Sequence, residues 1–262
     1  MKTSSLLGPG DPPPVEICND AGRADALLIC DHASAAIPAG LRDLGLDASE
    51  RLRHIAWDIG VAEVTRRLAR QLDAPAILSG YSRLVIDCNR SLDDPTSIAQ
   101  VSDGIEVRGN RGLDATARAA RAEACFWPYH RAIAERIAQA RAAARHPVLI
   151  SMHSFTPVME GFERPWHVGI LWNSDGRVAK RLLQALGRDP SLTVGDNEPY
   201  SGKNGRGYGV RMHGEEAGLA HGLIELRQDL IDTHHGAVAW VDRLAPILAE
   251  IISDPELDRR AP

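Results

Sequence analysis

The 262-residue chain lacks the long apolar segments and the basic charge that define several protein classes. No window approaches the ~18 apolar residues of a membrane span, and the first residues lack the apolar core of a secretory signal. The formal net charge is -5 and the pI is about 6.1, so the chain has no general attraction for nucleic acid or anionic membranes. We therefore expect a cytoplasmic protein that binds neither nucleic acid nor a membrane.

Several catalytic signatures are also missing. The four cysteines form no CxxC pair, which indicates reduced, buried thiols and not a zinc knuckle or a disulfide frame. No GxSxG motif is present, so serine catalysis has no motif support. The glycine-rich stretch NGRGYG at residues 204–209 has neither the GxGxxG order nor a Walker pattern. We interpret it as a mobile loop that closes on a small anion.

The composition is that of an ordinary globular protein, with 44% hydrophobic and 25% charged residues. A chain of this length can bury one full core, so we predict one domain over residues 15–253. Residues 1–14 are rich in proline and glycine and are predicted to be a disordered tail, and residues 254–262 a C-terminal tail.

Short apolar runs alternate with segments of helical periodicity along the chain. This alternation predicts an α/β fold with three layers and a mainly parallel sheet. Two long irregular connections, residues 91–112 and 197–214, are of the kind that carries function. The predicted strands cover residues 26–30, 75–79, 84–88, 147–157, 166–172, 192–194 and 222–229. The predicted helices cover residues 49–68, 114–145, 176–186 and 236–252, and the second is interrupted at Pro128, which starts a new helix.

Two histidines follow apolar runs that we predict to be central strands. His32 ends ALLICDH, and His153 lies near the end of PVLISMHSFTP. Ligands of open α/β sheets bind at the carboxyl ends of the strands, where the loops splay apart. Neutral imidazole is a favoured zinc ligand, and a catalytic zinc takes three protein ligands. The sequence therefore predicts that His32 and His153 bind a metal.

The third ligand is less obvious, because Ala35 stands where an H-x-x-E motif would place its acid after His32. Our choice is Asp58, 26 positions after His32, on the predicted helix over residues 49–68. His54 lies four residues before Asp58 and hence on the same face of that helix. We expect His54 to support Asp58, and His54 itself is the alternative ligand.

Charged residues in two other apolar segments extend the candidate site. Glu225 lies inside LIELR and could accept a proton from water, although a salt bridge to Arg227 is the simpler alternative. Arg83, Asn89 and Arg90 belong to SRLVIDCNR, predicted to be a strand and the loop after it. They could bind carboxylates, because the guanidinium group is a two-pronged donor. The alternative is an ion pair with Asp87.

Taken in order, DHAS, RHIAWDIG, SRLVIDCNR, SMHSFTP, EPYSGKNGRGYGVRMHG and GLIELRQDLI resemble the N-formylglutamate amidohydrolase family over residues 26–250. The resemblance implies zinc-dependent amide hydrolysis on a phosphorylase/hydrolase-like fold similar to zinc carboxypeptidases and aspartoacylase. By this resemblance His32, Asp58 and His153 match the metal ligands, the D-x-N-R segment at residues 87–90 matches the substrate-binding segment, and Glu225 matches the base.

We therefore expect an amidohydrolase that uses Zn²⁺, or another divalent metal, to remove a formyl or small acyl group from an N-acyl acidic amino acid such as N-formyl-L-glutamate. Arg83 would hold the developing oxyanion. The substrate carboxylate would be bound by Asn89 and Arg90 with Tyr200, Ser201 or Arg211. Two alternatives stay open: a zinc deacylase or carboxypeptidase for another N-acyl amino acid or peptide, and a non-catalytic small-acid binding protein. The oligomeric state is also open.

Overall fold

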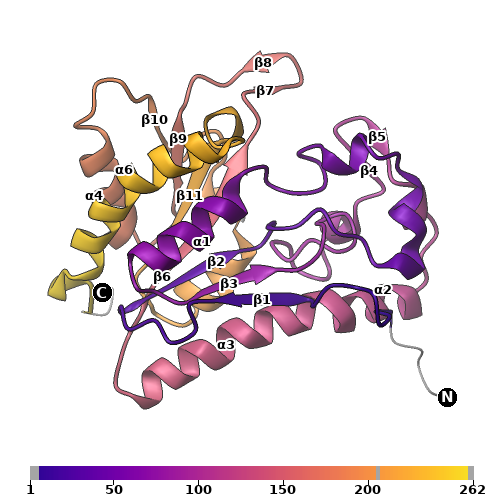
Figure 1. Cartoon of the computed structure of the whole chain (residues 1–262), viewed down its shortest axis with the longest axis horizontal. Coiled ribbons are helices and arrows are strands. Elements are labelled where there is room, and N and C mark those ends of the chain that lie inside the picture. Colours follow the sequence, from indigo (N-terminus) through magenta and orange to yellow (C-terminus); the bar gives the residue numbers. More distant parts are fainter. Residues whose placement is uncertain (1–5, 205–206, 259–262) are drawn as a thin grey trace.

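The structure is a computed structural model that describes residues 6–204 and 207–258 (Figure 1). Its strands and helices alternate along much of the chain, as predicted. The strands are β1 (Val15–Cys18), β2 (Ala26–Cys30), β3 (Ala76–Ser79), β4 (Val101–Ser102), β5 (Ile105–Glu106), β6 (Val148–Phe155), β7 (Val158–Met159), β8 (Phe162–Glu163), β9 (Val168–Leu171), β10 (Val194–Asp196) and β11 (His221–Arg227). The α-helices are α1 (Val61–Gln71), α2 (Ala115–Arg121), α3 (Trp127–Ala142), α4 (Arg177–Leu186), α5 (Tyr208–Val210) and α6 (His234–Ile252).

Seven strands form the central sheet in the order β1-β3-β2-β6-β11-β9-β10. The four central strands, β3, β2, β6 and β11, are mutually parallel. At the edges, β1 is antiparallel to β3 and β9 is antiparallel to β11. The sheet is therefore mixed but mostly parallel, and the predicted α/β class is confirmed.

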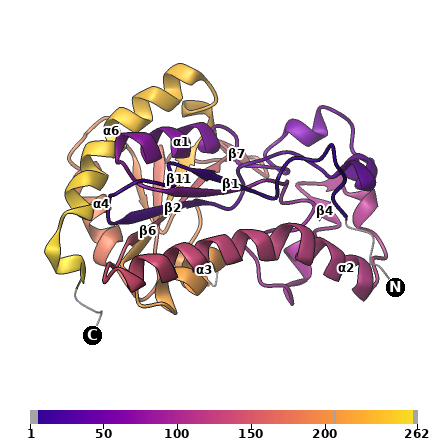
Figure 2. The same ribbon diagram turned by 60° about the horizontal axis from the view of Figure 1, so that its bottom comes forward.

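Helices cover both faces of the sheet, so the fold has three layers (Figure 2). Alternate residues of a strand point to opposite faces. On β2, Leu28 and Cys30 join the core formed with α1, α4 and α6, whereas Leu27 and Ile29 join the core formed with α3. A leucine as completely buried as Leu28 would cost about 2–5 kcal/mol of stability if replaced by alanine.

The predicted strand at residues 84–88 is wrong, because side chains of SRLVIDCNR hold the backbone in turns. The Ser82 hydroxyl accepts a hydrogen bond from the Leu84 N–H (3.1 Å), and the Asp87 carboxylate accepts one from the Asn89 N–H (2.8 Å). Such local bonds compete with strand pairing. Apolar Leu84, Val85 and Ile86 are buried all the same, which explains why the segment reads as a strand.

The predicted helix over residues 49–68 is wrong in its first half. A short 3-10 helix covers Glu50–Leu52, turns follow, and α1 begins only at Val61. Gly60, before α1, has a φ of 80°, and a Cβ there would lie 2.2 Å from the Ile231 carbonyl oxygen. This close approach requires glycine. His54 and Asp58 therefore do not share a helix face.

The predicted long helix at residues 114–145 is present as α2, a π-helical turn over Ala122–Phe126 and α3, which begins at Trp127 just before Pro128. The edge strand β1 was not predicted, because four residues after a proline-rich stretch give little periodicity. The division into tails and one domain stays a prediction. Gly205 and Arg206 of the NGRGYG stretch lie outside the described residues. Within the described residues, no helix is long and apolar enough to cross a membrane.

Candidate active site

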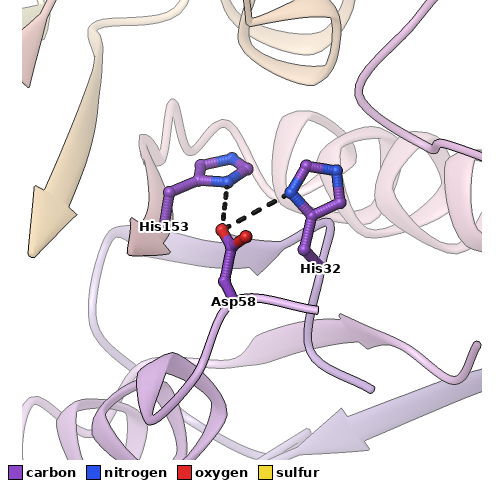
Figure 3. Close-up of side chains that lie close together, drawn as sticks. All are labelled: His32, Asp58 and His153. Atoms are coloured by element: carbon purple, nitrogen blue, oxygen red, sulfur yellow. Dashed lines mark hydrogen bonds and ion pairs between the residues drawn. The ribbon is translucent and has the colours of Figure 1, made fainter. Parts of the chain in front are cut away.

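His32, Asp58 and His153 meet at the carboxyl edge of the sheet (Figure 3). His32 follows β2, and His153 lies near the end of the neighbouring strand β6. The N–H of Asp58 donates to the His32 carbonyl (3.0 Å), which fixes the Asp58 turn against the end of β2. All three side chains are buried, and one ligand atom from each lies within 4.8 Å of the others.

A separate carboxylate orients each imidazole ring of this cluster. His32 Nε2 lies 2.6 Å from Asp87 Oδ1, and His153 Nε2 lies 3.0 Å from Asp31 Oδ2. With a metal on the Nδ1 atoms, each Nε2 would carry the proton and donate it to its carboxylate. Both Nδ1 atoms face Asp58 Oδ2, at 3.4 Å from His32 and 2.9 Å from His153 (Figure 3).

The donor set fits a divalent metal such as zinc. Two imidazole nitrogens and one carboxylate are a ligand set found in catalytic zinc sites. His32 Nδ1 is a buried atom that has no hydrogen-bond partner among the described residues. Metal-binding histidines usually donate their other N–H to a carboxylate or carbonyl, as Asp87 and Asp31 allow here. A metal would satisfy the buried nitrogen.

The electrostatics of the cluster also favour a cation. Burial alone raises the pKa of Asp58, but the adjacent His32 and His153 outweigh it, and the pKa lies below its ordinary value. For His153 the effect of burial has the opposite sign and lowers the pKa, but hydrogen bonds to Asp31 and Asp58 raise the pKa well above its ordinary value. The charge of these carboxylates therefore attracts positive charge to the cluster.

Glu225 lies on β11 directly beside His153, its partner in the parallel register. Its side chain is buried, and Oε2 has no hydrogen-bond partner among the described residues. Burial raises the pKa of Glu225 to about 7; the positive charge of His153 opposes this rise, and the negative charge of Asp58 adds to it. The alternative salt bridge is absent, because Arg227 pairs with Asp229 (2.8 Å).

Arg83 bridges two carboxylates of the site. Its guanidinium lies 3.1 Å from Asp58 Oδ1 and 3.3 Å from Asp87 Oδ2. Burial lowers the pKa of Arg83, but Asp87 and Asp58 raise it above its ordinary value. The ion pair with Asp87 is therefore present, and 27% of the side chain is still exposed. Arg83 also lines the cavity next to the cluster.

That cavity has a volume of about 70 Å³. Asn89 and Arg90 line it together with the cluster, Glu225 and Tyr200. The Asn89 Oδ1 accepts from the Gly209 N–H (3.3 Å), so the loop around α5 closes on this segment. Arg90 Nη1 donates to the Asn89 carbonyl (3.0 Å), and no described carboxylate forms an ion pair with Arg90.

The other predicted residues lie farther out. The Ser201 hydroxyl accepts from the Lys203 N–H (3.2 Å), and Ser201 is not part of the cavity wall. Arg211 lines a neighbouring cavity of about 200 Å³. The expected support of Asp58 by His54 is wrong: His54 Nε2 faces Asp103 at 3.5 Å, because the turns before α1 separate the two residues.

Sequence reasoning gave no role to Asp31 and treated Asp87 mainly as a partner of arginine. A carboxylate at the end of an apolar run was the available signal for both. Arg164, which contacts Tyr200, was also missed. It follows the β7–β8 hairpin in a polar stretch, where nothing in the sequence distinguishes it from a surface arginine.

The fold and the site define a class: a three-layer α/β protein with a mostly parallel sheet and a buried His-Asp-His cluster at the carboxyl edge. The N-formylglutamate amidohydrolase family model matches residues 24–232, and the chain belongs to that family. Membership implies a hydrolase that acts on an amide bond.

Two solved structures are similar over nearly the whole chain. A gene product of Agrobacterium tumefaciens is 36% identical, with a TM-score of 0.92, and the match covers 96% of this chain and 99% of that one. The N-formylglutamate amidohydrolase of Ralstonia eutropha JMP134 is 20% identical, with a TM-score of 0.69 and coverage of 95% and 99%. At that identity the second likeness supports the fold alone. A search of curated proteins found no match.

Proposed function

We propose that the protein is a metal-dependent amidohydrolase that removes a formyl or small acyl group from an N-acyl acidic amino acid such as N-formyl-L-glutamate. The observation that carries the proposal is the convergence of both Nδ1 atoms on Asp58, with a carboxylate behind each ring. It occurs in a chain whose family is named for this reaction.

His32, Asp58 and His153 would hold the metal, and zinc is our choice because the ligands are two imidazoles and one carboxylate. A zinc ion held there would lower the pKa of a water molecule to about 7 and would polarise a carbonyl oxygen. Asp87 and Asp31 keep the two rings oriented, so the ligands are in place before substrate arrives.

Glu225 is the proposed general base. Its side chain is buried beside His153, and one of its oxygens has no hydrogen-bond partner in the described part of the chain, so it can accept a proton from water. A pKa of about 7 suits a group that takes up a proton and then donates it near neutral pH. The same carboxyl group can therefore return the proton to the departing amine, and the products are the free amino acid and the carboxylic acid.

Arg83 and Arg90 have different proposed roles. Arg83 lies against Asp58 and lines the cavity, so it could stabilise the oxyanion that develops there. Arg90 lines the cavity and has no ion-pair partner among the described carboxylates, so it can bind the substrate carboxylate. Asn89 and Tyr200 provide further hydrogen bonds. Ser201 and Arg211 lie farther from the cluster and are left with a supporting role in the loop.

A panel of N-formyl and N-acetyl amino acids tests the proposal. Protein purified with its metal, and protein stripped by a chelator and reloaded with zinc, would be assayed for release of formate or acetate. We expect activity on N-formyl acidic amino acids that is lost on stripping and restored by zinc. Hydrolysis of another acyl class would reassign the substrate, and binding without turnover would support a small-acid binding protein.

A further inference from the structure

Arg164 directly follows β8, the second strand of the β7–β8 hairpin that comes after β6. Figure 1 shows this hairpin projecting from the sheet. The Arg164 N–H donates to the Pro157 carbonyl (2.8 Å), and its own carbonyl accepts from Arg227 Nη1 (3.4 Å). Arg164 is only 7% exposed. The backbone on both sides of the hairpin therefore fixes the position of a buried guanidinium.

This guanidinium has an unusual environment for a buried charge. Among the described residues, no carboxylate lies within ion-pair distance of Arg164. The ring of Tyr200 lies 4.9 Å from Cζ and the ring of Phe155 5.8 Å. Nη1 donates to Tyr200 Oη (3.1 Å) and to the Thr156 carbonyl (3.4 Å). Aromatic faces and neutral oxygens thus take the place of a counter-ion, at the cost of desolvating the charge.

The contact with Tyr200 also sets the direction of the tyrosine hydroxyl. Guanidinium groups only donate hydrogen bonds, so Tyr200 Oη accepts from Arg164. Its hydrogen must then point away from Arg164. Tyr200 lines the cavity that contains the His-Asp-His cluster. An acceptor in that cavity, such as a substrate oxygen, is therefore a partner to which the hydroxyl can donate.

We infer that Arg164 is a positioning residue that acts through Tyr200: it holds the ring at the cavity wall and directs the hydroxyl hydrogen toward bound substrate. The inference rests on the proposed function, because it needs a substrate with an oxygen near Tyr200. It gives the hairpin at residues 157–164 a role in substrate affinity.

A double-mutant cycle on ligand binding tests this inference. Glu225→Gln serves as the parent protein, because it should bind substrate without turning it over. In the zinc-loaded parent, the Kd for N-formyl-L-glutamate would be measured by calorimetry with Arg164→Met, Tyr200→Phe and both. We expect each single change to weaken binding about three- to tenfold, as for the loss of one hydrogen bond, and the double change to be no worse than Tyr200→Phe.

Other outcomes overturn the inference in distinct ways. Fold-changes that multiply in the double variant would mean that Arg164 contacts the ligand independently of Tyr200. An unchanged Kd in Arg164→Met, with a lowered melting temperature only, would mean a purely structural role. If the parent itself does not bind N-formyl-L-glutamate, the proposed function fails and this inference with it.

Two further variants sharpen the result. Arg164→Lys keeps the charge and one donor, so it should recover part of the lost affinity; a loss equal to that of Arg164→Met would contradict the role of the hydrogen bond. Arg53→Gln is the matched control, because Arg53 is a partly exposed cation that pairs with Asp103 and does not touch Tyr200. Its Kd should equal that of the parent. Equal losses of affinity in Arg53→Gln and Arg164→Met would mean that removing a positive charge, and not the contact with Tyr200, weakens binding.

Discussion

Two carboxylates behind the histidines fix which ring nitrogens face Asp58. Asp87 and Asp31 each take the Nε2 of one ring, so both Nδ1 atoms face Asp58. An unoriented histidine could present either nitrogen, and the loss of such a partner typically costs a metal site 10- to 100-fold in affinity. Residues that never touch the metal are therefore expected to set its binding strength.

Asp87→Asn should weaken zinc binding by roughly 10- to 100-fold, because asparagine keeps the shape of aspartate but removes its charge behind His32. Competition with a chromophoric chelator would give the zinc affinity. Asp103→Asn is the control, since Asp103 contacts Arg53 and His54 outside the cluster. Equal zinc affinity in Asp87→Asn and the control would mean that Asp87 does not contribute to zinc binding.

Glu225→Gln separates catalysis from stability. Glutamine cannot accept the proton, so kcat should fall by about 10² to 10⁴ while zinc content and substrate affinity persist. The melting temperature should not fall, because Glu225 has no salt bridge with Arg227 to lose. Asp229→Asn, which breaks the ion pair that Arg227 does form, should leave kcat unchanged. Near-normal turnover in Glu225→Gln would exclude it as the base.

At the level of elements, α3 and the π-helical turn over Arg211–Glu215 are joined by a buried pair of histidines. His130 Nε2 donates to the Cys88 carbonyl (3.0 Å), which leaves His130 Nδ1 to accept from His213 Nε2 (2.9 Å). Burial, together with the neighbouring His130, lowers the pKa of His213 from 6.5 to about 4. Both rings are therefore neutral in the folded protein at neutral pH.

The histidine pair predicts a pH-dependent stability. Between about pH 6.5 and pH 4, His213 is protonated in the unfolded chain but neutral in the folded chain. The folded state is therefore destabilised relative to the unfolded state as the pH drops through this range. The loss is about 2 kcal/mol at pH 5. Melting temperatures between pH 7.5 and pH 5 should therefore fall more steeply for the wild type than for His213→Gln. The exposed His235→Gln should follow the wild type, and parallel curves for all three proteins would refute the prediction.

Helices and strands could be predicted from the sequence where neighbouring residues determine them, and could not be predicted where distant contacts do. Buried strands such as β2 and β6 are visible as apolar runs, and α4 and α6 as periodic ones. The turns at residues 53–60 and 81–90 are not, because they depend on Gly60 meeting Ile231 and on the side chains of Ser82 and Asp87. Both segments carry site residues, so the errors concentrate at the site.

The same reasoning explains what the sequence revealed of the site. His153 and Glu225 lie on strands and His32 closely follows one, and the ends of these strands could be predicted. Because the strands are parallel, the three side chains were expected at the same edge of the sheet. The pairing of His32 with Asp87, 55 residues apart, and of Tyr200 with Arg164 depends on loop paths that no local pattern records. Asp58 was assigned to the cluster for the wrong reason, since the His32 backbone and not a helix places it there.

For the molecule as a whole, the cluster joins segments that are distant in the chain. Asp58 and His153 are 95 residues apart, and His153 and Asp31 122. The unfolded chain cannot assemble these ligands, so a metal should bind the folded state and stabilise it by mass action. We therefore expect metal binding to require the complete fold.

Zinc content is the most direct test of the proposed metal centre. Metal-free protein would be incubated with excess zinc, desalted and measured by mass spectrometry for zinc per chain. We predict one tightly bound zinc in the wild type and in His54→Ala, and a large loss in Asp58→Ala, because Asp58, and not His54, lies between His32 and His153. A wild type that retains no zinc, or an Asp58→Ala variant that retains as much as His54→Ala, would contradict the assignment.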